Sequence, residues 1–116
     1  MSITVYGIPN CDTVKKAKKW LEAHDVDYEF HDYKKLGIDS ASLKSWSKAV
    51  GWEVLLNKRG TTFRKLSDDQ KSDLTQTKAI KLMQEHTSLI KRPVIVKGMQ
   101  HLVGFDDEEY KKHLAK

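Results

Sequence analysis

Apolar and polar residues alternate near the start of the chain and then recur at helical spacing. Ile3–Tyr6 alternates and consists of strand-forming residues. Over residues 11–24, apolar positions from Val14 to Leu21 repeat at the spacing of one helix face. Alternation returns over Val26–Phe30. A strand, a helix and a strand within ~30 residues predict a parallel βαβ unit with a right-handed crossover.

The middle of the chain, from about residue 34 to 87, has helical patterns and no strong strand pattern. Asp39 or Ser40 can cap a helix whose apolar face carries Leu43, Trp46 and Val50 and which ends at Gly51. A short apolar patch from Trp52 to Leu56 follows. Two more helices are predicted, one starting at Ser67–Gln70 and one marked by Ala79, Ile80 and Met83 that ends near His86.

Strand patterns return in the last quarter of the chain. Val94–Val96 and His101–Val103 flank a turn at 97–100 and predict a hairpin. Asp106 with Glu109 three residues later resembles a capping box, which predicts a last helix. The element order is therefore β-α-β, a helical insertion, then β-β-α. It predicts a single α/β domain with a four-stranded mixed sheet, a core of about residues 1–33 and 88–116, and an insertion of about 34–87.

Composition fits one soluble globular domain. The chain has 116 residues, of which 39% are hydrophobic and 32% charged. No apolar run approaches the ~20 residues that cross a membrane, and the N-terminus does not resemble a secretory signal. We therefore expect a cytoplasmic protein without membrane association. The net charge is +5, but 16 acidic residues are interleaved with the basic ones, which makes direct nucleic-acid binding the weakest interpretation.

The chain contains one cysteine, Cys11, at the predicted start of the first helix. A helix N-terminus has free N–H groups and a partial positive charge, which stabilise the reactive thiolate. Asp12 works against the thiolate, because a neighbouring carboxylate raises a thiol pKa. The alternative is a small buried hydrophobic residue, although the polar neighbours place Cys11 off the apolar stripe. Val14 stands where a C-x-x-C motif would have its second cysteine, so any redox cycle needs an external thiol.

Three arginines are candidates for binding anions. Arg92 precedes Pro93 and the predicted strand, where it can reach an anion or a thiolate, or lie on the surface. Arg59 and Arg64 lie in a polar loop around Gly60, where they can bind carboxylates or phosphates or simply be solvated. The five histidines have no metal-ligand spacing, so we expect no metal site.

The residues above resemble the ArsC-like family, which includes arsenate reductases, Spx/MgsR regulators and small YffB-type proteins. Five segments carry the resemblance over essentially the full length: Thr4–Thr13, Leu55–Gly60, Phe63–Arg64, Arg92–Val96 and Val103–Phe105. The YffB-type group matches best. The resemblance implies a thioredoxin-like fold with a helical insertion and a cis Pro93 beside the thiol.

The resemblance also implies roles for single residues. Cys11 matches the nucleophilic cysteine of the family, and Arg92 matches the arginine that helps hold the oxyanion. Asn57 and Gly104 stand where arsenate reductases of this type carry two further arginines. Val14 replaces the second cysteine of the Spx switch. Arsenate reduction and a redox-sensing disulfide are therefore not expected here.

The leading hypothesis is a cytoplasmic monothiol reductase of thiol or oxyanion substrates, with glutathione as co-substrate and no bound cofactor. Cys11 and Arg92 would be catalytic. The residues expected to bind the substrate or glutathione are Asn10, Thr13, Arg59, Arg64 and Pro93. The alternative is a non-enzymatic, Spx-like regulatory module that binds RNA polymerase or another protein.

Overall fold

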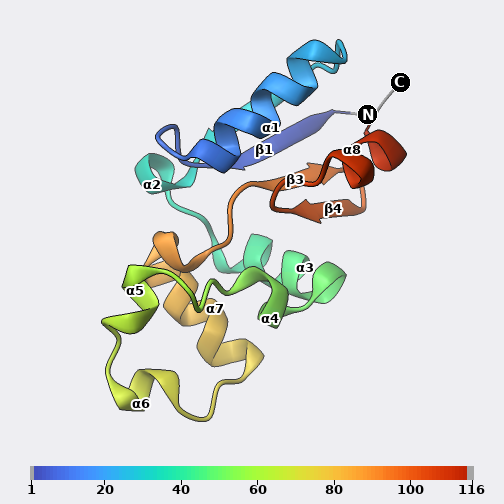
Figure 1. Cartoon of the computed structure of the whole chain (residues 1–116). Helices are drawn as coiled ribbons and strands as arrows, with labels where there is room; N and C mark the ends of the chain where they lie inside the picture. The colour runs from blue at the N-terminus through green and yellow to red at the C-terminus, as the bar shows by residue number, and fades with distance from the viewer. Residues whose placement is uncertain (1, 115–116) are drawn as a thin grey trace. The chain divides into compact units, whose positions relative to one another are not determined.

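The computed structural model describes residues 2–114, and the chain forms two compact units. The first unit joins the chain up to Leu36 with the chain from Arg92 onward, and the second spans residues 37–91. Figure 1 shows the helical second unit interrupting the α/β first unit between β2 and β3. The sequence predicts this interruption at about residues 34–87. That both units form a single domain stays a prediction.

The first unit is built on a four-stranded mixed sheet in the order β2-β1-β3-β4. β1 and β2 are parallel, whereas β1–β3 and β3–β4 are antiparallel. The predicted α/β, thioredoxin-like order of a βαβ half and a ββα half is confirmed. The elements are β1 (Ile3–Gly7), α1 (Asp12–Ala23), β2 (Glu29–Asp32), α2 (Tyr33–Leu36), β3 (Val94–Lys97), β4 (Gln100–Val103) and α8 (Asp107–His113).

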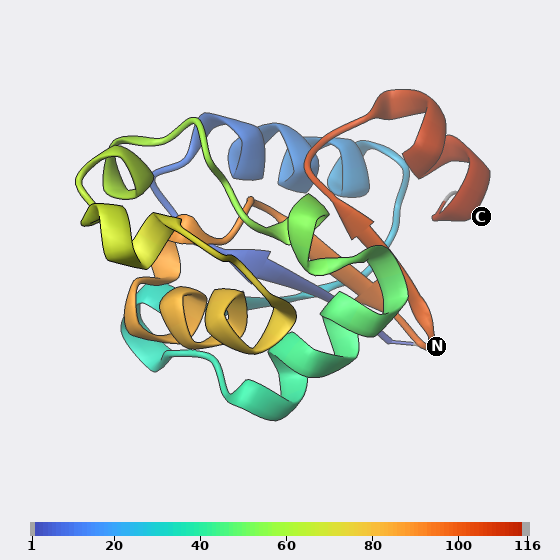
Figure 2. The same ribbon diagram turned by 90° about the horizontal axis from the view of Figure 1, so that it is seen from below.

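Helices α1 and α8 pack on one face of the sheet and enclose the core of this unit. Figure 2 shows both helices on the same side of the strands. The apolar stripe predicted for α1 is buried along its whole length, because its members repeat at helical spacing. The core cluster consists of Ile3, Val5, Ala17, Trp20, Leu21, Val26, Ile95, Tyr110 and Leu114. This packing fixes α1, and with it the residue that begins the helix, against the central strand.

The second strand lies later in the chain than its alternating pattern predicts. β2 spans Glu29–Asp32, and its pairing with β1 begins at Glu29. Val26, the predicted start of the strand, instead donates its N–H to the carbonyl oxygen of Leu21 at 2.8 Å. Asp25 has a positive φ of 54°. The chain is still leaving the helix at this point, so Val26 is buried in the core without belonging to the sheet.

The second unit is a cluster of short helices around its own apolar interior. α3 contacts α7 and α4, and α4 contacts α7. Asp39 caps α3 by accepting the N–H of Ser42 at 2.7 Å, and Gly51 ends it with a φ of 94°, as predicted. The elements are α3 (Ser40–Val50), α4 (Trp52–Leu55), α5 (Thr61–Arg64), α6 (Asp68–Lys71), α7 (Gln76–Glu85) and the 3₁₀ helix η1 (Thr87–Leu89).

The structure adds detail to one predicted feature of this unit and corrects another. The apolar patch from Trp52 to Leu56 is mostly the short helix α4, which buries Leu55 while Val54 stays 44% exposed. One helical turn cannot direct all of its apolar side chains inward. The polar segment around Gly60 was predicted as a loop, but its last residues, Thr61–Arg64, form the short helix α5, which begins directly after Gly60. The capping box predicted at Ser67 and Gln70 is present.

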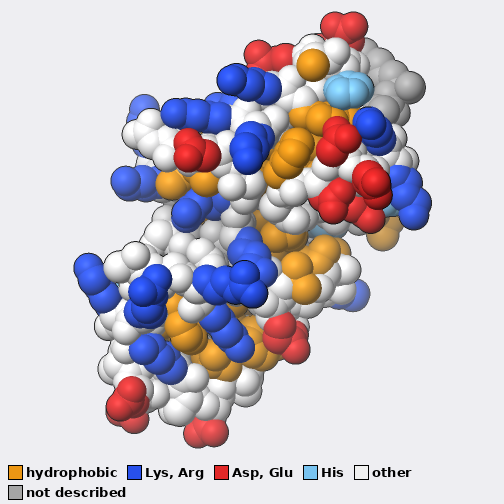
Figure 3. Space-filling model, viewed as in Figure 1, with side chains coloured by type: hydrophobic (Ala, Val, Ile, Leu, Met, Phe, Trp, Pro, Cys, Tyr) orange, Lys and Arg blue, Asp and Glu red, His pale blue; other side chains and the backbone are white. Residues whose placement is uncertain are grey.

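Charge is mixed on the visible surface of both units. Figure 3 shows lysine and arginine side chains on each unit, with acidic side chains gathered over α8, whose first turn carries Asp107, Glu108 and Glu109. Within residues 2–114, no helix has the length and apolar character to cross a bilayer.

Candidate functional site

Three segments of the first unit meet at one end of the sheet. The parallel pairing of β1 and β2 sets Gly7 beside Asp32, so both strands end there. The antiparallel pairing of β1 and β3 sets Tyr6 beside Val94, so β3 begins there. The loop after β1 leads to Cys11, the chain after β2 continues into Tyr33, and Arg92 and Pro93 precede β3. These residues therefore come together although they lie far apart in the sequence.

Cys11 is the N-cap of α1 and directly precedes the first residue of that helix, Asp12. Its backbone is extended, with φ −115° and ψ 124°, and its carbonyl oxygen accepts the N–H of Lys15 at 2.9 Å. The side chain is partly exposed and makes no cap hydrogen bond of regular geometry, although the N–H groups of Thr13 and Val14 act on the sulfur. This is the N-cap position, where unpaired N–H groups and the helix dipole favour an anion.

The pKa of the Cys11 thiol lies below its ordinary value. Partial burial is the largest single influence and raises this pKa. Hydrogen bonds from the Val14 N–H, the Arg92 side chain and the Thr13 N–H lower it, as does the charge of Arg92, and together they outweigh the burial. Asp12 is not among these main influences. A lowered pKa increases the fraction of reactive thiolate at neutral pH.

Tyr33, which sequence reasoning did not single out, is part of this cluster. It is fully buried, and the Arg92 side chain donates a hydrogen bond to its hydroxyl oxygen. Burial is the main cause that raises the pKa of Tyr33 far above its ordinary value, and the charges of Cys11 and Asp32 add to it, while Arg92 opposes them. The one available signal was the position of Tyr33 directly after a predicted strand, which does not distinguish it from a packing residue.

The other predicted site residues of the first unit, Asn10, Thr13 and Pro93, lie at the same end of the sheet, but they differ in their burial and in their contact with Cys11. Thr13 offers its N–H to the sulfur of Cys11. Pro93 is buried, and the Arg92–Pro93 bond is cis, as the resemblance implies. Asn10 is exposed in the turn before the helix.

Arg59 and Arg64 belong to the second unit and lie next to each other there. The Arg64 Nη2 donates to the carbonyl oxygen of Arg59 at 3.2 Å. A cavity of about 390 Å³ is lined by Glu53, Leu56, Asn57, Lys58, Arg59 and Lys91. Three of these six side chains are cationic and one, Glu53, is anionic, so the excess of positive charge suits an anionic ligand. Arg64 is not among the lining residues.

Asn57 and Gly104, the two departures from the arsenate-reductase pattern, have local structural roles. The Asn57 Oδ1 accepts the N–H of Arg59 at 3.2 Å, and its own N–H donates to Leu89 at 2.7 Å. Gly104 has a φ of 80°, a conformation that disfavours any residue with a Cβ. An arginine at this position would be strained, even though the space around it is open.

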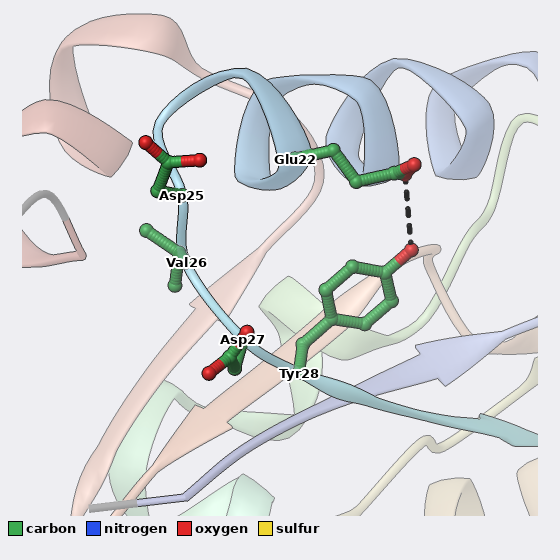
Figure 4. A pocket seen from close by; sticks show the side chains of 5 residues that line it. All are labelled: Glu22, Asp25, Val26, Asp27 and Tyr28. Atoms are coloured by element: carbon green, nitrogen blue, oxygen red, sulfur yellow. Dashed lines mark hydrogen bonds between the residues drawn. The ribbon is translucent and has the colours of Figure 1, made fainter.

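A separate cavity of about 290 Å³ lies at the other end of α1, around the turn that follows the helix. Figure 4 shows Tyr28 directed toward Glu22, to which its hydroxyl donates at 3.2 Å. Asp25, Val26 and Asp27 complete the lining. This cavity does not include the thiol. Among the described residues, no three His, Cys, Asp or Glu side chains are grouped to hold a metal ion.

Comparison with known proteins agrees with this fold. The model of the ArsC family matches residues 6–113. An uncharacterized protein of Haemophilus influenzae is 46% identical over 113 residues, which is 97% of this chain and 99% of that protein. The solved structure of a YffB protein has a TM-score of 0.96 and 51% identity, and the match covers 98% of this chain and 100% of that chain.

A second group of relatives consists of global transcriptional regulators. The global transcriptional regulator Spx of Listeria innocua is 28% identical over 116 residues, which is 98% of this chain and 88% of that protein. The fold, a thioredoxin-like sheet interrupted by a helical unit, and the cysteine at its first helix define a class of small thiol proteins. The chain belongs to the ArsC family.

Proposed function

We propose that this protein is a cytoplasmic monothiol reductase in which Cys11 is the nucleophile and glutathione is the external thiol. The lowered pKa of Cys11 carries the proposal, because a thiolate at neutral pH is what the first step needs. The chain has no second cysteine. The adduct formed on Cys11 must therefore be resolved by a thiol from outside.

A mixed disulfide between glutathione and a substrate thiol illustrates the reaction. The Cys11 thiolate attacks the glutathione sulfur, a new disulfide to Cys11 forms, and the substrate leaves as its thiolate and takes up a proton. A second glutathione thiolate then attacks this disulfide, which releases oxidised glutathione and regenerates Cys11. The substrate sulfur is reduced from disulfide to thiol, the added glutathione is oxidised from thiol to disulfide, and the two glutathione units end as one disulfide.

Arg92 supports both steps of this reaction. Its guanidinium stabilises Cys11 as an attacking thiolate and as a leaving group, because both forms carry a negative charge. Asn10, Thr13 and Pro93 would bind the substrate or glutathione at the same end of the sheet. Arg59 and Arg64 would bind anionic groups, and the cationic lining of the cavity that contains Arg59 supports this role.

The decisive experiment is a screen of glutathione-linked reduction with mixed disulfides and arsenate as substrates. We expect turnover of mixed disulfides, weak or absent turnover of arsenate because Asn57 and Gly104 replace two arginines, and no turnover by Cys11→Ser. Alkylation of Cys11 as a function of pH provides an independent check. A pKa at or above that of a free thiol would remove Cys11 as the nucleophile.

The second candidate function is a regulatory module that binds RNA polymerase or another protein. The similarity to Spx across 98% of this chain favours it. A pull-down with RNA polymerase, using the wild type and Cys11→Ser, separates the two functions. Strong binding that the substitution does not change supports the module, whereas turnover that depends on Cys11 without such binding supports the reductase.

A further inference from the structure

Tyr33 occupies a defined place beside the thiol. It follows the last residue of β2, which pairs with the last residue of β1, so the strand pairing places Tyr33 at the end of the sheet where Cys11 lies. The Asp32 Oδ1 accepts the N–H groups of Lys34 and Lys35 at 3.0 and 3.2 Å. These two bonds fix the start of α2, whose first residue is Tyr33.

The Arg92 side chain links Tyr33 to the thiol. The guanidinium acts on both groups: its hydrogen bond and its charge lower the pKa of the Tyr33 hydroxyl and the pKa of the Cys11 thiol. Tyr33 has no exposed surface, so its ring is held by packing and cannot follow the arginine if that side chain moves. A guanidinium is planar with its donors in fixed directions. A hydrogen bond to a fixed hydroxyl therefore restricts where its other donors point.

We propose that Tyr33 is a positioning residue whose hydroxyl holds the Arg92 guanidinium against the sulfur of Cys11. The inference rests on the proposed function in one respect, since the Cys11 thiolate that Arg92 stabilises is the proposed nucleophile. Tyr33 does not touch the substrate in this scheme. It acts through Arg92, and its effect appears as a change in the ionisation of Cys11.

The charges around Tyr33 are compatible with this role. The charged or titratable groups that act on its hydroxyl include Arg92, Cys11 and Asp32. Burial, helped by the two negative charges, keeps the pKa of Tyr33 well above neutral even though Arg92 lowers it. The residue therefore stays a neutral phenol at physiological pH, and its oxygen can accept from Arg92 without forming a competing ion pair that would draw the arginine charge away from Cys11.

The test compares Tyr33→Phe with Tyr110→Phe. Tyr110 is a matched control in the same unit, because it is also buried and its hydroxyl donates to the carbonyl oxygen of Gly104 at 2.6 Å. The measurement is the rate of Cys11 alkylation by iodoacetamide between about pH 5 and pH 10. We expect Tyr33→Phe to raise the midpoint and to slow alkylation about 3- to 10-fold at neutral pH. Tyr110→Phe should leave the midpoint unchanged.

Two further variants show whether Tyr33 acts through Arg92. In an Arg92→Gln background, Tyr33→Phe should have no additional effect on the midpoint. Should Tyr33→Phe not fold, 4-fluorophenylalanine at position 33 keeps the ring and fills the volume of the hydroxyl with a weak acceptor, and the same rise is expected. An unchanged or lowered midpoint, or an equal effect in the Arg92→Gln background, would overturn the proposal.

The alkylation test requires no glutathione and no substrate. If the protein shows no reductase turnover but Tyr33→Phe raises the midpoint of Cys11 alkylation, the proposed function is refuted and this inference stands. A protein that turns over normally with an unchanged midpoint in Tyr33→Phe refutes this inference alone.

Discussion

The Arg92 guanidinium acts on the thiol of Cys11 and lowers its pKa through a hydrogen bond and its charge, although the two residues lie near opposite ends of the chain. The sheet explains the contact, because β3 starts where β1 ends. The hydrogen bond and the charge of this cation add to the stabilisation of the thiolate by the Val14 and Thr13 N–H groups at the start of the helix. Arg92 therefore matters more for the reactivity of the thiol than its position beside a predicted strand indicates.

Replacing Arg92 should make Cys11 a weaker acid. In Arg92→Gln the midpoint of alkylation against pH should rise by about one pKa unit, because the charge and its hydrogen bond are lost while partial exposure limits the effect. Lys97→Gln is the control. Lys97 is a cation at the far end of β3, the strand that follows Arg92 and Pro93, and its Nζ donates to the carbonyl oxygen of His113 at 3.1 Å. An equal rise in both variants would mean that net charge, not the contact, sets the pKa.

The close approach of Gly7 to Val14 should make position 7 intolerant of a larger side chain. A Cβ on Gly7 would lie 2.8 Å from Val14 Cγ2, and Val14 is fully buried. Gly7→Ala should lower the free energy of unfolding by about 1–3 kcal/mol, measured by urea denaturation. Combining it with Val14→Ala should cost less than the sum of the two single changes. Additive losses would show that the contact is not the cause.

The elements and their order follow from local patterns, which is why the sequence predicts them well. The apolar repeat from Val14 to Leu21 and the alternation that begins at Ile3 arise because the side chains that face the core recur with the period of a helix or a strand. The start of β2 was predicted too early, because alternation does not reveal that Val26 still bonds to the preceding helix. Strand ends depend on pairing with a neighbour, and the pattern of one segment does not contain that information.

The site was predictable only where one residue carries its own signal. Cys11 has such a signal, since it is the lone cysteine at a helix start. The role of Arg92 came from the family resemblance, and its local sequence was equally compatible with a surface arginine. Tyr33 was missed because its relation to Arg92 arises from the pairing of β1 with two other strands. A single tyrosine after a strand has no spacing or composition that reveals this.

Asp107 should make the stability of the first unit depend on acid pH. The Trp20 Nε1 donates a hydrogen bond to the Oδ1 of Asp107 at 2.6 Å. This bond is the largest cause that lowers the pKa of Asp107, followed by the hydrogen bond from Lys111. A carboxyl whose pKa is lower in the folded state stabilises the fold above its unfolded pKa of about 3.9, and that contribution is lost as the pH falls through the folded value.

The corresponding measurement compares urea denaturation at about pH 7 and about pH 3. Acidification should destabilise Asp107→Asn less than the wild type, because the amide keeps an acceptor for Trp20 but does not titrate. Glu108→Gln, in the same helical turn, serves as the control and should keep the wild-type difference. If Asp107→Asn shows the full acid sensitivity, other carboxyl groups are responsible.

Asp39 should stabilise the second unit as the N-cap of α3. Its Oδ1 accepts the N–H of Ser42 at 2.7 Å, and α3 buries Leu43 and Trp46. Asp39→Ala leaves that N–H without its acceptor and should cost about 1 kcal/mol, seen as faster amide hydrogen exchange in α3 and in α7, which packs against it. Asp39→Asn keeps the acceptor and should exchange nearly as slowly as the wild type. If Asp39→Asn is destabilised as much as Asp39→Ala, the charge of Asp39 acting on the helix dipole, rather than the hydrogen bond, stabilises this end of α3.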